Sequence, residues 1–186
     1  MDPDEIMMNT EEGMEKAAEY MSHEFASIRT GKASAALVDN IDVEAYGSMM
    51  KLKQLALIST PEPRMIVISP FDASTTQAIE RAIRESKIGI QPSVDGKIIR
   101  LPIPALSEER RRDLVKTLKT IAEETRVRIR SSRREGMEQL KKAQKDGAIT
   151  EDDLGKYEKD VQKLTDDYVK KVDDGFASKE ADIMKV

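Results

Sequence analysis

The 186-residue sequence has no cysteine, no tryptophan and a single histidine, His23. Without cysteine, the chain can form neither disulfide bonds nor thiolate metal sites. One histidine leaves no histidine cluster, and its place on the polar face of the first predicted helix indicates a solvated side chain. We therefore predict no metal site and no bound cofactor.

Aromatic residues, long apolar runs and a basic N-terminus are also missing. Aromatics make up only 4% of the residues while 35% are charged, a profile that suits long helices better than a sheet-dominated protein. No run of about 18 apolar residues could span a membrane. The acidic start "MDPDEIMMNTEEG" has the features of neither a signal nor a transit peptide. We predict a cytoplasmic protein with no membrane contact.

Helical periodicity is present at both ends of the chain. Asp2 can cap a helix that starts at Pro3 and ends just before Gly31. A second helix of about 38 residues follows Ser107, and Thr150 with Asp153 forms a capping-box pattern that opens a third. The predicted apolar stripe of the first helix, which Glu11 interrupts, is Met7, Met14, Ala18, Met21, Phe25 and Ile28. The other two stripes are Leu114, Leu118, Ile121, Thr125, Ile129, Ser132, Gly136, Leu140 and Ala143, and Leu154, Tyr157, Val161, Leu164, Tyr168, Val172 and Phe176.

Between residues 32 and 106 the period changes. "NIDVEAYG" alternates apolar and polar residues as a half-buried strand does. "LALIS" and "MIVIS" are short apolar runs, and "VDGKIIRL" indicates a turn that leads into a strand. "STTQAIERAIRES" has helical spacing, with Ser74 as its cap. This stretch predicts a small mixed α/β unit.

These segments predict an α+β fold that is L-shaped overall. Residues 1–31 and 107–186 form a long three-helix bundle, and a small β/α/β sandwich domain, residues 32–106, is inserted between them. The chain then crosses between the domains near 30–34 and 102–106, which makes a hinge. The predicted hinge residues are Gly31, Lys32, Ser34, Pro102 and Pro104.

Charge is divided unevenly among the predicted helices of this acidic chain, whose net charge is −4. Residues 107–145 carry thirteen basic and seven acidic side chains, whereas residues 1–31 carry two and eight, and residues 150–186 carry seven and eleven. Arg126, Arg130 and Arg133 fall within roughly 60° of one another on the second helix. Lys119 and Arg112 extend this stripe, Arg134 lies at its edge, and Arg128 points elsewhere.

Two interpretations of the arginine stripe remain open at this stage. The arginines can pair with acidic residues of the first and third helices, or they can form a ridge that binds phosphates, for which guanidinium groups are well suited. Aromatics are too few for base stacking, so a nucleic-acid ligand would be folded RNA, contacted through its backbone. Gly13, Gly136, Gly155 and Gly175 in the helices either permit close helix approach or are weak points.

Several motifs resemble the bacterial and organellar ribosome recycling factors over essentially the whole chain. The matching stretches are "IRTGKAS" at 28–34, "YG" at 46–47, "QLA" at 54–56, "IRLPIPALSEERRRDLVK" at 99–116, "RIRSSRRE" at 128–135, "DVQKLTD" at 160–166 and "KEADIM" at the end. The resemblance implies a three-helix bundle with an inserted β/α/β domain. It also implies binding to the large subunit of the post-termination ribosome, followed by subunit separation driven by elongation factor G with GTP.

The same resemblance assigns roles to individual residues. Arg130 and Arg133 match the functional arginines of the second bundle helix, and Arg29 and Gly31 match an arginine and a glycine before the hinge. The predicted RNA-binding set is Arg130, Arg133, Arg126, Arg29, Arg112, Lys119 and Arg134. The sequence departs from the family pattern at Lys32, Ala35, Ser131 and Ser132.

The functional prediction is a monomeric, non-enzymatic recycling factor with no catalytic residue and no cofactor of its own, since the partner uses the GTP. A different class of function, a helical adaptor that binds another protein through its acidic helices, remains an alternative. A hydrolase is the weakest alternative because neither a nucleophile–base pair nor a phosphate-cradling glycine loop is evident.

Overall fold

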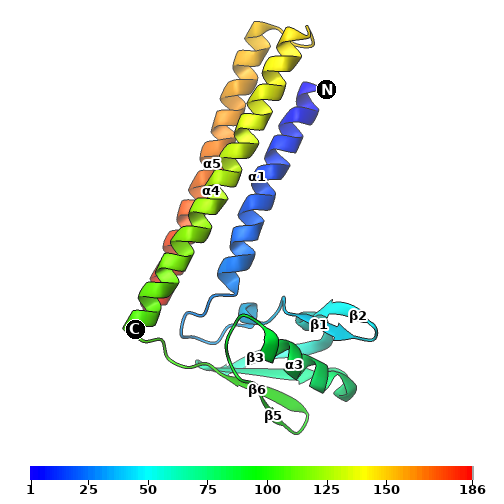
Figure 1. Cartoon of the computed structure of the whole chain (residues 1–186), viewed down its shortest axis with the longest axis vertical. Helices are drawn as coiled ribbons and strands as arrows, with labels where there is room; N and C mark the ends of the chain where they lie inside the picture. Colours follow the sequence, from blue (N-terminus) through cyan, green and yellow to red (C-terminus); the bar gives the residue numbers. More distant parts are fainter. Residues whose placement is uncertain (186) are drawn as a thin grey trace. The chain divides into compact units, whose positions relative to one another are not determined.

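A computed structural model describes residues 1–185 of the chain. Three long helices, α1 (Pro3–Ala26), α4 (Glu108–Lys145) and α5 (Glu151–Met184), run alongside one another as a bundle (Figure 1). The predicted bundle is therefore confirmed, and α4 has the predicted length of 38 residues.

The three helices begin where the sequence predicted caps. Asp2 Oδ1 accepts a hydrogen bond from the backbone N–H of Asp4 at 3.0 Å. The Ser107 hydroxyl accepts one from the backbone N–H of Arg110 at 3.1 Å. Thr150 and Asp153 form a reciprocal pair, each side chain accepting from the other's backbone N–H, at 3.1 and 3.2 Å. Each cap satisfies donors that have no partner inside the helix.

The buried stripe of α1 differs from the prediction. Its fully buried residues are Ile6, Thr10, Met14, Ala17, Met21 and Phe25. The predicted Met7 and Ala18 are only half-buried, although Met7 still packs against the core of the bundle. Thr10, rather than Glu11, takes the position between Ile6 and Met14. A threonine can be buried here because its hydroxyl donates to the carbonyl of Ile6 at 2.8 Å.

The end of α1 was also predicted too late. The helix ends at Ala26, and Gly31 lies in the following loop with φ +82°. In α4 and α5, the predicted Ile121 and Leu164 are only half-buried, and their neighbours Ala122 and Thr165 are buried instead.

The middle of the chain forms two antiparallel sheets and a helix. Strands β1 (Asp42–Ala45) and β2 (Ser48–Lys51) form a hairpin. The second sheet has the order β3-β4-β6-β5, from strands Ala56–Glu62, Met65–Pro70, Ile98–Pro102 and Ser93–Asp95. Short helical turns η1 (Ala35–Leu37), α2 (Leu52–Leu55) and η2 (Ala73–Thr75) connect these elements. Strand β2 and these turns were not predicted, and β5 lies partly in a stretch that was predicted to be a turn.

Helix α3 (Thr76–Glu85) buries Ile79 and Ile83 in the same hydrophobic core as Ile66, Ile68 and Ile99 of the four-stranded sheet. The predicted β/α/β sandwich is therefore present. Ser74 is not the cap of this helical segment, which corrects the prediction. Asp72 has that role, because its Oδ1 accepts from the backbone N–H of Ser74 at 2.9 Å.

The chain forms two compact units. One contains Met1–Phe25 and Val115–Ala181, and the other contains Ala26–Leu114 together with the chain's end from Asp182. These boundaries differ from the predicted 31/32 and 106/107 by several residues. The predicted hinge stays a prediction.

The β1–β2 hairpin turns through Tyr46 and Gly47, whose φ angles are +53° and +76°. Positive φ at both central residues is the pattern of a type I′ turn, and it is rare for a tyrosine. The Tyr46 hydroxyl donates to Asp72 Oδ2 at 2.6 Å, so the turn is tied to the cap of the helical segment that follows β4. This hydrogen bond, followed by those from Ser74, lowers the pKa of Asp72.

Substitution of Tyr46 by phenylalanine should raise the pKa of Asp72 toward its ordinary value, because the largest cause of its lowering is removed. A lowered folded-state pKa stabilises the fold above the unfolded pKa, and that contribution is lost as pH falls through the folded value. The variant should therefore lose part of this stabilisation at neutral pH, since the hydrogen bonds from Ser74 remain. NMR titration of the Asp72 carboxyl carbon tests this, with Tyr20→Phe in the other unit as control. An unchanged Asp72 titration would contradict the role given to this hydrogen bond.

Candidate nucleic-acid interface

Three arginines of α4, Arg126, Arg130 and Arg133, form the arginine ridge. Their spacing of four and three residues places them on one face of the helix. Each has a different partner, and these partners decide how much of each positive charge remains available.

Arg126 is held within the bundle. Its Nε and one terminal nitrogen donate to Asp173 Oδ1 of α5 at 3.0 and 2.7 Å, and the other terminal nitrogen donates to Glu123 at 3.3 Å. The side chain is only 21% exposed. Hydrogen bonding to Asp173 raises the pKa of Arg126 more than its burial lowers it. Pairing with the third helix, one of the two interpretations of the stripe, is therefore confirmed for this arginine.

Arg130 and Arg133 are less strongly neutralised. Arg130 donates to Glu123 at 3.3 Å, and its side chain is 55% exposed. Arg133 Nε donates to the amide oxygen of Gln162 at 2.9 Å, and the same amide donates to Asp166 at 2.9 Å. Because this hydrogen-bond partner carries no charge, it does not neutralise the guanidinium of Arg133.

The neighbouring basic residues have different environments. Lys119 and Arg134 are exposed. Arg128 points away from the ridge, as predicted, and its guanidinium carbon lies 4.4 Å from the centre of the Tyr20 ring of α1, a cation–π contact. This stacking holds Arg128 against the first helix.

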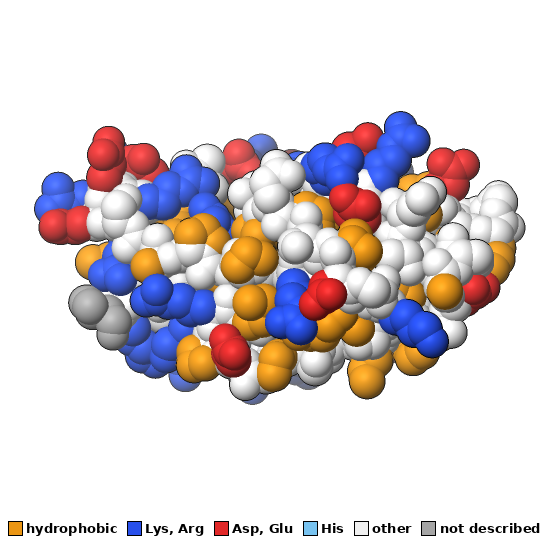
Figure 2. Space-filling model, turned by 90° about the horizontal axis from the view of Figure 1, so that it is seen from below, with side chains coloured by type: hydrophobic (Ala, Val, Ile, Leu, Met, Phe, Trp, Pro, Cys, Tyr) orange, Lys and Arg blue, Asp and Glu red, His pale blue; other side chains and the backbone are white. Residues whose placement is uncertain are grey.

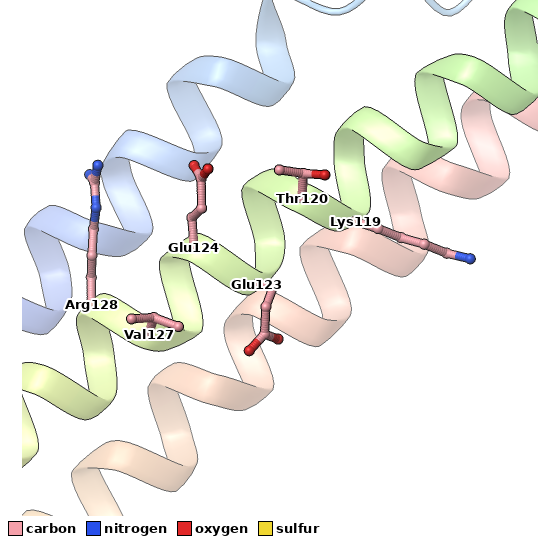
Figure 3. Close-up of a pocket in the computed structure, with 6 residues that line it drawn as sticks. All are labelled: Lys119, Thr120, Glu123, Glu124, Val127 and Arg128. Atoms are coloured by element: carbon pink, nitrogen blue, oxygen red, sulfur yellow. The ribbon is translucent and has the colours of Figure 1, made fainter.

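Two shallow hollows border the ridge. One, of about 600 Å³, is lined by Lys119, Thr120, Glu123, Glu124, Val127 and Arg128, and Val127 is 54% exposed there (Figure 3). The other, of about 260 Å³, is lined by Lys119, Ala122, Glu123, Arg126 and Phe176. Figure 3 shows Glu124 and Arg128 pointing to the same side of α4 and Glu123 pointing to the other.

Two members of the predicted RNA-binding set lie in the other compact unit. Burial first, and then repulsion from the Arg110 guanidinium, lower the pKa of Arg29. Arg112 pairs with Glu108 at 2.6 Å one turn earlier in α4. Arg29 and Arg112 are therefore described apart from the ridge, and their membership in the RNA-binding set stays a prediction.

The predicted RNA-binding set left out two other arginines of this unit, Arg110 and Arg111. Repulsion from Arg110 contributes to the lowered pKa of Arg29, after burial. The Nε atom of Arg111 is the buried side-chain nitrogen or oxygen that finds no hydrogen-bond partner within residues 1–185. The run "EERRRD" in the sequence contains both arginines, but its composition is also that of an ordinary exposed first turn of a helix.

The predicted hinge residues occupy different local structures. Gly31 lies in a loop, and a Cβ built on it would be 3.7 Å from the Leu106 side chain. Ser34 caps the turn η1 by accepting from the backbone N–H of Ala36 at 3.3 Å, so Ala35 starts that turn. Pro102 is the last residue of β6 and pairs with Met65.

Exposed hydrophobic side chains are found mainly on the unit that contains the sheets. They include Tyr46, Met49, Leu57, Phe71 and Val94. On the face seen in Figure 2, hydrophobic side chains are interspersed with charged and other polar ones. Within the described part of the chain, no helix is long and apolar enough to cross a membrane, and no group of three or more histidine or acidic side chains could hold a metal ion.

The ribosome recycling factor family model matches residues 21–184. The chain belongs to the ribosome recycling factor family. A relative from Akkermansia muciniphila, a ribosome-recycling factor, is 54% identical over 188 residues, and the match covers 100% of both chains. The resemblance deduced from the motifs is therefore confirmed.

Two solved structures of the family match along the whole chain. A solution structure of a ribosome recycling factor is 43% identical with a TM-score of 0.82, covering 100% of this chain and 99% of the other. A second match has a TM-score of 0.69 and 39% identity and covers 100% of both chains. It is a model of the T. thermophilus factor with E. coli elongation factor G on the E. coli post-termination complex. The α+β fold with a three-helix bundle is that of this family.

Proposed function

We propose that this protein recycles ribosomes after termination. It binds the large subunit of the post-termination ribosome and, together with elongation factor G and GTP, promotes separation of the subunits for a new round of translation. The observation that carries this proposal is family membership over residues 21–184. The solved relative bound to a post-termination complex with elongation factor G supports it.

The arginine ridge is the proposed contact with ribosomal RNA. Arg130 and Arg133 supply exposed or weakly neutralised guanidiniums that suit the phosphate backbone. Arg126 borders them from its place against Asp173, and Lys119 and Arg134 add positive charge nearby. Arg29 and Arg112 are proposed as further RNA contacts from the other unit.

The protein acts by non-covalent displacement in this proposal, as a cytoplasmic monomer without a cofactor of its own. Elongation factor G hydrolyses the GTP. The segments at 30–34 and 102–106, with Gly31 at positive φ, are the proposed hinge between the bundle and the inserted domain. A hinge would let the factor change shape on the ribosome while each unit keeps its own core.

Splitting of purified post-termination ribosomes tests the function directly. Subunit separation, followed by light scattering, should require this protein, elongation factor G and GTP together. Omission of each component in turn is the control. If all components are present and no splitting occurs, the recycling function is wrong, and retention of a protein partner after nuclease treatment would then favour the adaptor alternative.

A further inference from the structure

Glu123 is an acidic residue inside the arginine ridge. Its Oε2 accepts from Arg126 and its Oε1 accepts from Arg130, each at 3.3 Å. The two arginines lie three and seven residues further along α4, so they follow Glu123 on the same face, one and two turns away. One carboxylate therefore contacts two guanidiniums of the surface proposed to bind RNA.

The two arginines depend on Glu123 to different degrees. Arg126 has a second carboxylate partner in Asp173, at 2.7 Å, and is 21% exposed. The contact with Asp173 would keep the Arg126 side chain in place without Glu123. Arg130 is 55% exposed and pairs with Glu123 across 3.3 Å at the surface. Loss of Glu123 would free the guanidinium of Arg130 from this carboxylate and leave the bundle contact of Arg126 in place.

Glu123 is also open to a ligand on this surface. Its side chain is 58% exposed, and it lines both hollows that border the ridge. A phosphate that approached Arg130 would therefore meet the carboxylate of Glu123 before or beside the guanidinium. Two anions cannot share Arg130 without repelling each other.

We propose that Glu123 competes with RNA phosphate for Arg130, so that it weakens ribosome binding and speeds release of the factor. This inference rests on the proposed RNA-binding function. In the free protein, the carboxylate occupies the guanidinium of Arg130. On the ribosome, a phosphate replaces it, and the displaced carboxylate repels that phosphate from a neighbouring position. A factor that acts in successive rounds must dissociate, and a built-in competitor lowers the lifetime of its complex.

Glu123 could instead orient Arg130 for RNA binding, and its loss would then weaken binding. An exposed ion pair holds a long side chain only weakly, because entropy and screening offset its attraction. Arg126 is already oriented by Asp173. The repulsion of phosphate by Glu123 should therefore outweigh any ordering of Arg130 that it provides.

The test compares Glu123→Gln with Glu124→Gln, a matched control that removes the same charge from the next residue, which points to the other side of α4 (Figure 3). Binding to isolated large subunits is measured over a range of salt concentrations, with dissociation rates and thermal midpoints. Glu123→Gln should bind about threefold to fivefold tighter, chiefly through slower dissociation. Its salt dependence should steepen by up to roughly 0.9 in slope. Glu124→Gln should match the wild type.

A double-variant cycle with Arg130→Ala separates competition from a general charge effect. The gain from Glu123→Gln should shrink when Arg130 is absent. An equal gain in the Arg130→Ala background, an equal gain from Glu124→Gln, or weaker binding by Glu123→Gln would each overturn the competition. If the wild type binds and Arg133→Ala weakens that binding, the proposed function survives such a result. Absence of wild-type binding would overturn both.

Discussion

Replacement of Arg133 by alanine should weaken binding to the large ribosomal subunit by about 10- to 100-fold, because a hydrogen bond to a charged group is worth roughly 1.5–3 kcal/mol. Arg133 is the ridge arginine whose described partner, Gln162, carries no charge. Its guanidinium can therefore exchange that amide for a phosphate without giving up an ion pair. Subunit splitting at limiting factor concentration should fall in parallel.

The salt dependence of binding shows whether Arg133 binds a phosphate group. The slope of log affinity against log salt should become shallower by roughly 0.7–0.9 if the substitution removes one arginine–phosphate interaction. Lys142→Ala is the control. Lys142 is exposed on the same helix, nine residues on and about half a turn around from Arg133. Equal losses of affinity in both variants, or none in Arg133→Ala, would remove the ridge from the mechanism.

Replacement of Gly136 by valine should destabilise the helical bundle by about 3 kcal/mol, the upper end of the usual cost of overpacking. A Cβ built at Gly136 would lie 3.1 Å from Thr10 Cγ2 and 3.3 Å from Thr10 Cβ, and closer still to its Oγ1. Thr10 cannot move aside easily, since it is buried and its hydroxyl donates to the carbonyl of Ile6. Helices α1 and α4 must therefore separate.

Urea denaturation followed by helical circular dichroism measures this change in stability. Gly155→Val is the matched control, because a Cβ at Gly155 of α5 meets no atom within 4 Å, and it should be neutral or slightly stabilising through helix propensity. The double variant Thr10→Ala/Gly136→Val should recover part of the stability, because the contacting methyl and hydroxyl are gone. Equal stability of the Gly136 and Gly155 variants would show that α1 and α4 are not closely packed at Gly136.

Predictions from the sequence were most accurate where a structure depends on residues a few positions apart. The caps at Asp2, Ser107 and Thr150 and the length of α4 were all predictable, because capping hydrogen bonds span two or three residues and a helix repeats every 3.6. The predicted stripe of α1 was displaced by one residue at several positions because it, too, was based on periodicity alone. Thr10 is polar, so periodicity alone gave no reason to bury it.

The glycines illustrate a second limit. The sequence left open whether Gly136 and Gly155 permit close packing or are weak points. The structure distinguishes them, because a Cβ on Gly136 would meet Thr10 of α1, whereas a Cβ on Gly155 would have no contact within 4 Å beyond its own helix backbone among the described residues. Two helical glycines look alike in a sequence, and their difference depends on a residue more than a hundred positions away.

For the candidate site, the sequence by itself determined which helix concentrates the arginines and which face of that helix they share. The concentration of arginine on one face of α4, between two acidic helices, is a property of composition and helical period. Only the tertiary structure decided which arginines remain available. Asp173, 47 residues from Arg126, engages that side chain, whereas Arg133 meets only the neutral Gln162 among its described hydrogen-bond partners. The strength of a charge at a surface depends on its nearest counter-charge, and that neighbour is chosen by the packing of α5 against α4.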